Sequence, residues 1–306
     1  MKHWVLISLS FILLISACVR REERNQPTPI LPDTPISTVT YDISYGAADS
    51  ESQKLDIYFP ESIAAPLPVM IYVHGGAWSI GNKSAVQFKD DVFNSSGYIF
   101  ISINYRLSPE GTWEEMAEDV ALAVAWVYEN INVNGGDPGR IFLMGHSAGA
   151  HLVSLVATDE RYLQNIGLDL DALSGVVSLD TRAYNIPTLE TKEGVLPRVY
   201  APIFGDDPAQ WEAASPLWHV ETGKNIPPIA IAWSKGMLGN NDNATLRETP
   251  AREFYDVLDA AGISALLVDG STKTHAEINR QFGEPNNALT ETIMNWLKLI
   301  LEHTHL

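Results

Sequence analysis

Short apolar runs recur along the chain and predict the strands of a sheet. Five are nearly continuous: Val69–Val73, Tyr98–Ile103, Ile141–Met144, Val176–Leu179 and Ile229–Trp233. Continuous apolar runs are typical of parallel strands that helices cover on both faces, so we expect these five at the centre of a sheet. Leu55–Phe59 instead alternates apolar and polar positions, which predicts a half-buried strand.

Helical patterns lie between these strands. Apolar residues between 116 and 127 recur at helical spacing, with acidic residues on the other faces. Later, Thr249 and Pro250 suit an N-cap and a first helical residue, and Gly262 suits a C-terminal stop. Strands that alternate with helices predict an open α/β sheet.

The composition is that of an ordinary globular protein. A chain of 306 residues, 45% hydrophobic and 19% charged, fits one large α/β domain. The formal net charge of −18 argues against a nucleic-acid partner and against electrostatic adsorption to anionic lipid. No metal or cofactor motif appears, so neither is expected, and the sequence leaves the oligomeric state open.

The N-terminal segment is expected to direct secretion. Lys2 precedes an apolar stretch, Trp4–Ala17, which is too short to span a bilayer but suits a signal peptide. The stretch ends Ile-Ser-Ala-Cys18, which resembles the lipobox of bacterial lipoproteins, where the cysteine is lipidated and becomes the mature N-terminus. The alternative is an incidental cysteine at an ordinary cleavage site.

After Cys18 the chain is polar and rich in proline as far as residue 37, as in an extended tether. We therefore expect a signal peptide at 1–17, a lipidated tether at 18–37 and a folded catalytic domain at 38–306. The protein would be secreted and held at the bacterial cell envelope through lipid on Cys18 alone.

A GxSxG pentapeptide, Gly145–Gly149, directly follows one predicted strand. This is the pattern of the nucleophile elbow of serine hydrolases, in which Ser147 stands on a sharp strand-to-helix turn. A side chain at Gly145 or Gly149 would collide with the neighbouring strand or helix.

His74-Gly-Gly-Ala-Trp78 ends another predicted strand, where the HGGG-type oxyanion loop of lipases and esterases is expected. A carbonyl oxygen that gains charge needs preorganised donors. The expected donors are backbone N–H groups, listed here: Ala148, Gly76, Ala77 and, as a further candidate, Gly75. Trp78 either lines the acyl pocket or packs in the core, and His74 is expected to brace the loop.

The order of these motifs resembles the α/β-hydrolase superfamily. It is most similar to the carboxylesterase group with kynurenine formamidase-like and bacterial feruloyl or xylan-side-chain esterase-like proteins. The matching segments are Tyr45-Gly46, Leu55–Tyr58, His74–Trp78, Asn104–Leu107, Gly135–Pro138, Gly145–Leu152 and Ser215-Pro216. The resemblance implies a mostly parallel sheet with helices on both faces, a small cap insertion, and a triad in the order Ser, Asp or Glu, His.

The base that activates Ser147 is expected to be His275. It follows the last predicted strand, Ala265–Val268, and precedes a helix around residues 293–301, where this fold carries its histidine. His219 precedes the strand that should carry the acid, so it is out of order.

Two aspartates compete for the role of the acid. Asp242 ends the pattern Gly-Asn-Asn-Asp after the strand Ile229–Trp233, but only after an extended stretch. Asp180 directly follows the preceding strand. We favour Asp242 and keep Asp180 as the alternative; either could instead be an aspartate that caps a loop.

The long segment between these strands, 181–225, predicts a partial cap over the site. Its aromatic residues could bind an aryl or sugar group or pack the cap onto the fold: Tyr184, Tyr200, Phe204, Trp211 and Trp218.

The function expected from these features is hydrolysis of a small, aryl-linked or carbohydrate-linked ester through an acyl-enzyme. An arylformamidase, an exopeptidase and a non-catalytic binding protein are the alternatives. The expected location at the cell envelope disfavours an arylformamidase. No substrate-gating domain is expected, which disfavours an exopeptidase. The presence of both Ser147 and His275 disfavours a non-catalytic binding protein.

Overall fold

The computed structural model describes residues 38–303 except 47–49, 192–193 and 238–243. The chain divides into Met1–Pro35 and Ile36–Leu306, and every described residue belongs to the second part. The expected signal peptide and the whole of the expected tether, including Cys18, therefore lie outside the described residues. Among the helices that are described, none is both long and apolar enough to cross a bilayer.

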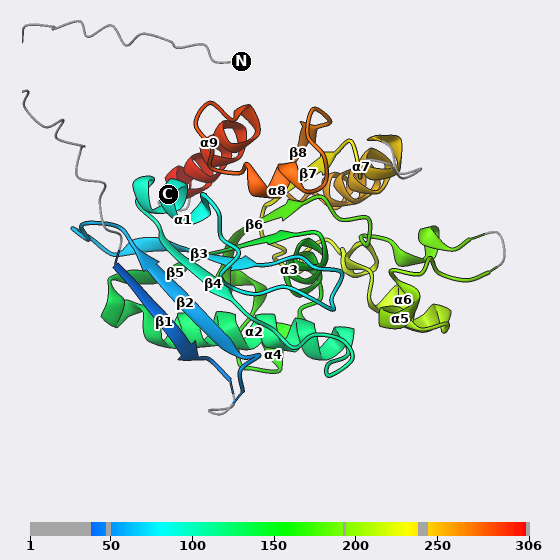
Figure 1. Cartoon of the computed structure of the whole chain (residues 1–306), viewed down its shortest axis with the longest axis horizontal. Helices are drawn as coiled ribbons and strands as arrows, with labels where there is room; N and C mark the ends of the chain where they lie inside the picture. The colour runs from blue at the N-terminus through cyan, green and yellow to red at the C-terminus, as the bar shows by residue number, and fades with distance from the viewer. Residues whose placement is uncertain (1–37, 47–49, 192–193, 238–243, 304–306) are drawn as a thin grey trace, which may run out of the picture. The chain divides into compact units, whose positions relative to one another are not determined.

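An eight-stranded sheet, in the order β1-β2-β4-β3-β5-β6-β7-β8, forms the centre of the fold (Figure 1). The strands from β4 to β8 are parallel, whereas β1 and β2 are antiparallel to their neighbours. Their bounds are β1 Thr38–Ser44, β2 Lys54–Phe59, β3 Leu67–Val73, β4 Ile99–Ile103, β5 Gly136–His146, β6 Leu173–Leu179, β7 Ile229–Ser234 and β8 Ala265–Gly270. The predicted, mostly parallel sheet is confirmed.

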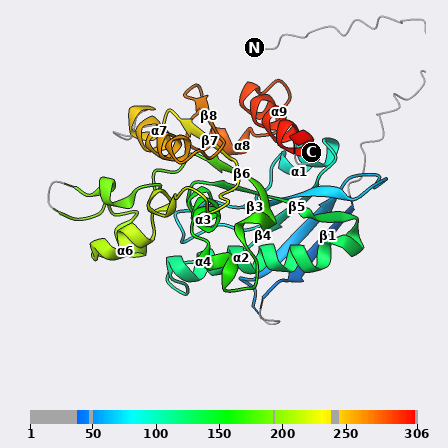
Figure 2. The same cartoon turned by 180° about the vertical axis from the view of Figure 1, so that it is seen from behind.

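Helices cover both faces of the sheet, as Figure 2 shows from behind. The α-helices are α1 Lys89–Ser95, α2 Trp113–Asn130, α3 Ala148–Thr158, α4 Arg161–Gln164, α5 Ala201–Phe204, α6 Pro208–Ala213, α7 Ala244–Ala260, α8 Glu277–Arg280 and α9 Ala288–His303. Four short 3-10 helices are η1 Ile131–Asn134, η2 Leu170–Ala172, η3 Ile186–Leu189 and η4 Pro216–His219.

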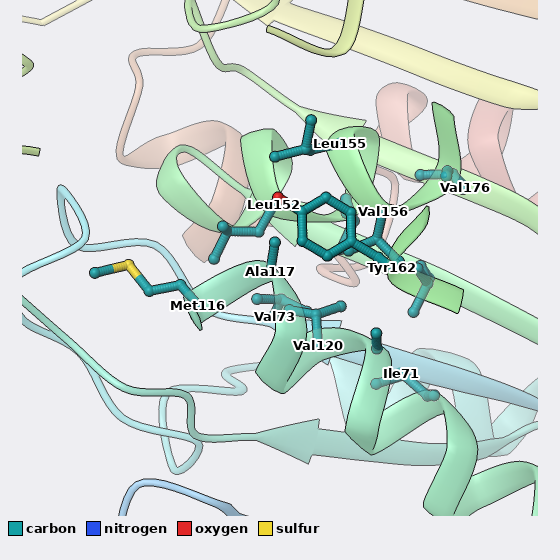
Figure 3. Close-up of a cluster of buried hydrophobic side chains, with 14 of the residues drawn as sticks. Ile71, Val73, Met116, Ala117, Val120, Leu152, Leu155, Val156, Tyr162 and Val176 are labelled. Carbon is teal, nitrogen blue, oxygen red and sulfur yellow. The ribbon is translucent and has the colours of Figure 1, made fainter. Parts of the chain in front are cut away.

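The burial of strand β3 on both faces explains why its sequence is apolar throughout. Ile71 and Val73 face the cluster formed with α2, α3 and α7, where they lie near Val120 and Leu152 (Figure 3). Tyr72, one position along, faces the second cluster, formed with α1 and α9. Because successive side chains of a strand point to opposite faces, a strand covered on both sides needs apolar residues at consecutive positions.

Two sequence predictions need correction. β2 is not half-buried, because its polar residue Asp56 is 1% exposed and accepts a 2.6 Å hydrogen bond from Lys83 Nζ. Helix α7 is already formed at Ala244, so Pro250 lies inside it and not at its first position. The expected end at Gly262 is confirmed: this glycine has a φ of +77°, which a residue with a side chain rarely adopts.

The cap segment, residues 181–225, leaves the sheet after β6 and returns at β7. It carries η3, α5, α6 and η4 at one side of the fold (Figure 1). Its aromatic residues Tyr184, Tyr200, Phe204 and Trp211 are buried in the main cluster, whereas Trp218 is 52% exposed. Most of these aromatics therefore attach the cap segment to the fold.

Candidate active site

Ser147 occupies the sharp turn between β5 and α3. Its φ of +55° is in the left-handed region, and its side chain is half-buried. A Cβ atom on Gly145 would lie 2.3 Å from the carbonyl oxygen of Gly149, and one on Gly149 would lie 2.1 Å from that of Val73. The two glycines are thus required because backbone from the helix and from β3 fills the space that a side chain would need.

His275 lies next to this serine. Its Nε2 atom is 3.0 Å from Ser147 Oγ, and its Nδ1 atom is 2.6 Å from Asp180 Oδ2. An ionised carboxylate can only accept, so Nδ1–H donates to Asp180 and Nε2 is left as an acceptor for the serine hydroxyl. This is the arrangement by which a histidine can remove a proton from a serine.

The carboxylate observed beside His275 is not the one favoured as the acid on sequence grounds. Asp242 lies in 238–243, outside the described residues, and the carboxylate that contacts His275 is Asp180. Asp180 ends β6 in a backbone conformation with a φ of +57°, and its backbone N–H donates to Ala232 of β7. The parallel pairing of β6, β7 and β8 therefore holds the loops that carry Asp180 and His275 at the same edge of the sheet.

The loop after β3 curls tightly beside Ser147. Gly76 has a φ of +133°, and its carbonyl accepts hydrogen bonds from the backbone N–H groups of Ser79 and Ile80. The backbone N–H groups of Gly76, Ala77 and Ala148 donate no hydrogen bond to another described residue. Ala148 is the first residue of α3, where backbone N–H groups lack partners within the helix.

A pocket of about 690 Å³ opens over the serine. The oxyanion-type loop, the β6–β7 cap segment and the segment around His275 all contribute to its wall. Among the lining residues are Gly75, Gly76, Ala77, Trp78, Ser147, Thr181, Tyr200 and His275. The residues expected to act together therefore meet in one cavity, with Trp78 both in its wall and only 3% exposed.

The comparisons with known proteins agree with this geometry. A family model described as BD-FAE matches residues 55–186. A truncated carbohydrate esterase from gut microbiota superposes with a TM-score of 0.71 at 20% identity, over 88% of this chain and 98% of that one. The chain has an α/β-hydrolase fold and is similar to proteins named as esterases.

The relatives of this chain carry different substrate names. A probable isoprenylcysteine alpha-carbonyl methylesterase of Oryza sativa subsp. japonica is 29% identical over 246 residues, or 77% of this chain and 58% of that protein. The kynurenine formamidase of Danio rerio is 25% identical over 268 residues, or 86% of this chain and 83% of that protein. This chain thus spans little more than half of the plant relative.

Buried polar groups surround Asp180. Ser234 donates to it through both its backbone N–H and its hydroxyl, and Arg247 Nη1 lies 3.7 Å from Oδ2. Burial by itself raises the pKa of Asp180, but the hydrogen bond from His275 and the charge of Arg247 outweigh it and lower the pKa to about 2. Asp180 is therefore ionised at neutral pH.

Arg247 Nη1 also lies 3.2 Å from His275 Nδ1. Both nitrogens carry hydrogen when Nδ1–H points to Asp180, so this approach is a contact of like groups and not a hydrogen bond. The arginine acts on the carboxylate, which needs a positive partner because it is buried.

His146 contacts His275 through its ring and through a hydrogen bond. The two rings lie 4.6 Å apart, and His146 Nε2 is 2.9 Å from the carbonyl oxygen of His275. Burial, reinforced by the neighbouring His275, keeps the pKa of His146 well below its usual value, so its ring is neutral and Nε2–H donates to the carbonyl.

His151 joins the oxyanion-type loop to the cap segment. Trp78 Nε1–H donates to His151 Nδ1 at 3.2 Å, and His151 Nε2–H donates to the carbonyl of Ala214 at 2.7 Å. Burial lowers the pKa of His151 to about 4, which leaves Nδ1 free to accept. Trp78 also makes an edge-on contact with Phe204 of α5.

His74 holds the start of the loop, as expected. Its Nδ1–H donates to the carbonyl of Gly75 at 2.8 Å, its ring stacks on Tyr105, and its carbonyl accepts from the Tyr105 hydroxyl. Neither Arg247 nor His151 was singled out from the sequence for these contacts, because their partners lie 67 and 73 residues away.

Proposed function

We propose that this protein is a serine ester hydrolase in which Ser147 is the nucleophile, His275 the general base and Asp180 the acid that orients it. The observation that carries the proposal is the continuous line of contacts from Ser147 Oγ through His275 to Asp180 at the wall of an open pocket. Asp180 thus replaces Asp242 in the assignment that we favour.

The proposed reaction follows from which atoms donate and accept. His275 Nε2 takes the proton of Ser147 as Oγ attacks the ester carbonyl, and Asp180 stabilises the imidazolium that forms. The free N–H groups of Gly76, Ala77 and Ala148 would bind the oxyanion. His275 then gives its proton to the leaving alcohol, and a water molecule activated by the same histidine hydrolyses the acyl-enzyme.

A formamide is the second candidate substrate. The similarity to a kynurenine formamidase, which extends over most of that protein, supports it. The same nucleophile and oxyanion donors serve ester and amide carbonyls, so the leaving group that fits the pocket decides between the two.

The test is a panel of substrates that differ in their leaving groups: short 4-nitrophenyl esters, methyl ferulate, acetylated xylan and N-formylkynurenine. We expect the esters to be cleaved with a kcat/KM at least tenfold above that for the formamide. A higher kcat/KM for N-formylkynurenine than for every ester would replace the ester proposal with the formamide one.

The lipid anchor remains a proposal from the sequence. Lipidation of Cys18 would place the catalytic domain at the cell envelope on a tether of about twenty residues. The small-molecule substrate would then be met outside the cytoplasm.

A further inference from the structure

Positive side chains gather in the wall of the pocket. Arg182, Arg247 and Arg280 line it, and none of the described lining residues is Asp or Glu. The whole chain has 38 acidic residues against 20 lysines and arginines. The charge of the pocket wall is therefore positive whereas the net charge of the chain is negative. This difference needs a local explanation.

Arg247 is already explained, because it neutralises the buried Asp180. Arg182 is different. Its side chain is partly buried, its Nε atom is inaccessible to solvent, and that atom has no hydrogen-bond partner. Within the described chain its guanidinium forms no ion pair, whereas Arg106, for example, binds Asp119 and Glu115.

An unpaired buried donor destabilises a protein unless another molecule supplies the acceptor. The penalty for such a donor is larger when the group is charged. A guanidinium presents its N–H groups in a planar fork that matches a carboxylate, which can accept two parallel hydrogen bonds. Arg182 therefore has the donor set of an anion-binding residue and no ion-pair partner among the described residues.

The position of Arg182 ties this donor to the reacting atoms. It stands two residues after Asp180 on the same loop, and Thr181 between them is also in the pocket wall. Arg280 stands five residues after His275, at the end of α8; it is exposed and has no ion-pair partner among the described residues. The two loops that carry the acid and the base thus each bring one unpaired arginine to the pocket.

We propose that Arg182 binds a carboxylate carried by the substrate, with Arg280 adding positive charge at the pocket, so that the preferred esters are anionic. This inference rests on the proposed ester hydrolysis and adds the class of substrate to it. Two classes of ester satisfy this inference, with the carboxylate on the acyl half or on the alcohol half.

Matched pairs of esters test this inference. On the acyl side, the mono-4-nitrophenyl ester of glutaric acid is compared with 4-nitrophenyl pentanoate; on the alcohol side, 4-acetoxybenzoate is compared with phenyl acetate. The readout is the ratio of kcat/KM for the anionic member to kcat/KM for the neutral member, measured for the wild type and each variant. Differences in intrinsic reactivity within a pair cancel when these ratios are compared between proteins.

We expect Arg182→Gln to lower this ratio for at least one pair by roughly 10- to 100-fold, as for the loss of a hydrogen bond to a charged group. The change should appear mainly in KM, and Arg182→Lys should restore part of it because the charge is kept. Arg252→Gln is the matched control: Arg252 lies on α7, is paired with Glu248 and is absent from the pocket wall, so its ratio should equal that of the wild type.

Equal ratios in the wild type and Arg182→Gln for both pairs, with melting temperatures that show both proteins folded, would overturn the inference while leaving ester hydrolysis in place. An equal fall of the kcat/KM ratio in Arg252→Gln would also overturn the inference, since the net charge of the protein alone would then explain the preference for anionic esters. If no ester of either pair is cleaved, the proposed function itself fails, and the inference fails with it.

Discussion

His275 Nδ1 lies 2.6 Å from Oδ2 of Asp180, although the two residues are 95 positions apart in the chain. The contact joins the loop after β6 to the loop after β8, and the buried Ser234 and Arg247 hold the carboxylate from the other side. The position of the Asp180 carboxylate is thus fixed by contacts from the end of β7, from α7 and from the loop after β8, and not by one contact alone.

Asp180→Asn should lower kcat for a 4-nitrophenyl ester by up to about 10⁴-fold, because an amide can donate to Nδ1 and so hold His275 in the wrong tautomer. Asp242→Asn is the matched control and should cost less than tenfold. Steady-state kinetics of the two variants against one ester separates the candidates. A larger loss of kcat in Asp242→Asn than in Asp180→Asn would assign the role of the acid to Asp242, which follows β7 in the sequence.

Trp78→Phe should destabilise the protein and slow the reaction. The change removes the donor to His151 Nδ1 and leaves a buried acceptor unpaired, at a cost of about 1–3 kcal/mol in the free energy of unfolding. It also loosens the loop that presents Gly76 and Ala77, so kcat should fall more than KM rises. Urea unfolding and ester kinetics measure the two effects.

Trp218→Phe is the control for that variant. Trp218 is also in a hydrogen bond, from its Nε1 to Asn185, but it is 52% exposed, so its loss should change the free energy of unfolding by less than about 0.5 kcal/mol. Equal destabilisation by the two changes would show that the contact between Trp78 and His151 has no special role.

Lys89 should make stability depend on pH above neutrality. Its ammonium is buried against Tyr72 and donates to the carbonyl of Asn279, and burial outweighs the nearby Asp90 and lowers the pKa of Lys89 to about 7. The unfolded chain, with a pKa near the ordinary 10.5, binds more protons between these two values. Stability due to Lys89 must therefore rise with pH from about 7 to about 10.

Lys89→Met isolates this effect, because methionine fills similar space and does not titrate. The free energy of unfolding of the wild type, minus that of Lys89→Met, should be constant below pH 7 and should increase between pH 7 and pH 10. Denaturant titrations at unit pH intervals measure it. A flat difference over this range would mean that Lys89 keeps an ordinary pKa in the folded protein.

Cys18→Ser should release the protein from membranes or leave its signal peptide uncleaved. A lipoprotein carries several acyl chains, and each buried methylene contributes about 0.8 kcal/mol to membrane binding, whereas one chain binds only marginally. Mass spectrometry of the N-terminal peptide measures the modification. An unmodified N-terminus at or beyond Cys18 would exclude the anchor and leave the catalytic assignments untouched.

The sequence predicted every strand of the sheet except β1, and two of the three residues that meet at the candidate site. The apolar runs were informative because each central strand is covered on both faces, and Ser147 and His275 could be found because their positions depend on local turns. Asp180 was placed second to Asp242 because the choice depends on which loop reaches His275 in space. The alternation of apolar and polar residues around Asp56 led to the wrong prediction of a half-buried strand for a similar reason, because its partner Lys83 is distant in sequence.

The central claim, that Ser147 is an activated nucleophile, is tested most directly by covalent labelling. The folded wild type is treated with a fluorophosphonate and the modified peptide is identified by mass spectrometry, with Ser147→Ala and His275→Ala in parallel. We predict stoichiometric modification of Ser147, together with a loss of labelling and of ester hydrolysis by roughly 10⁴-fold or more in both variants. A wild type that does not react at Ser147, or a Ser147→Ala variant that hydrolyses esters as fast as the wild type, would contradict the account.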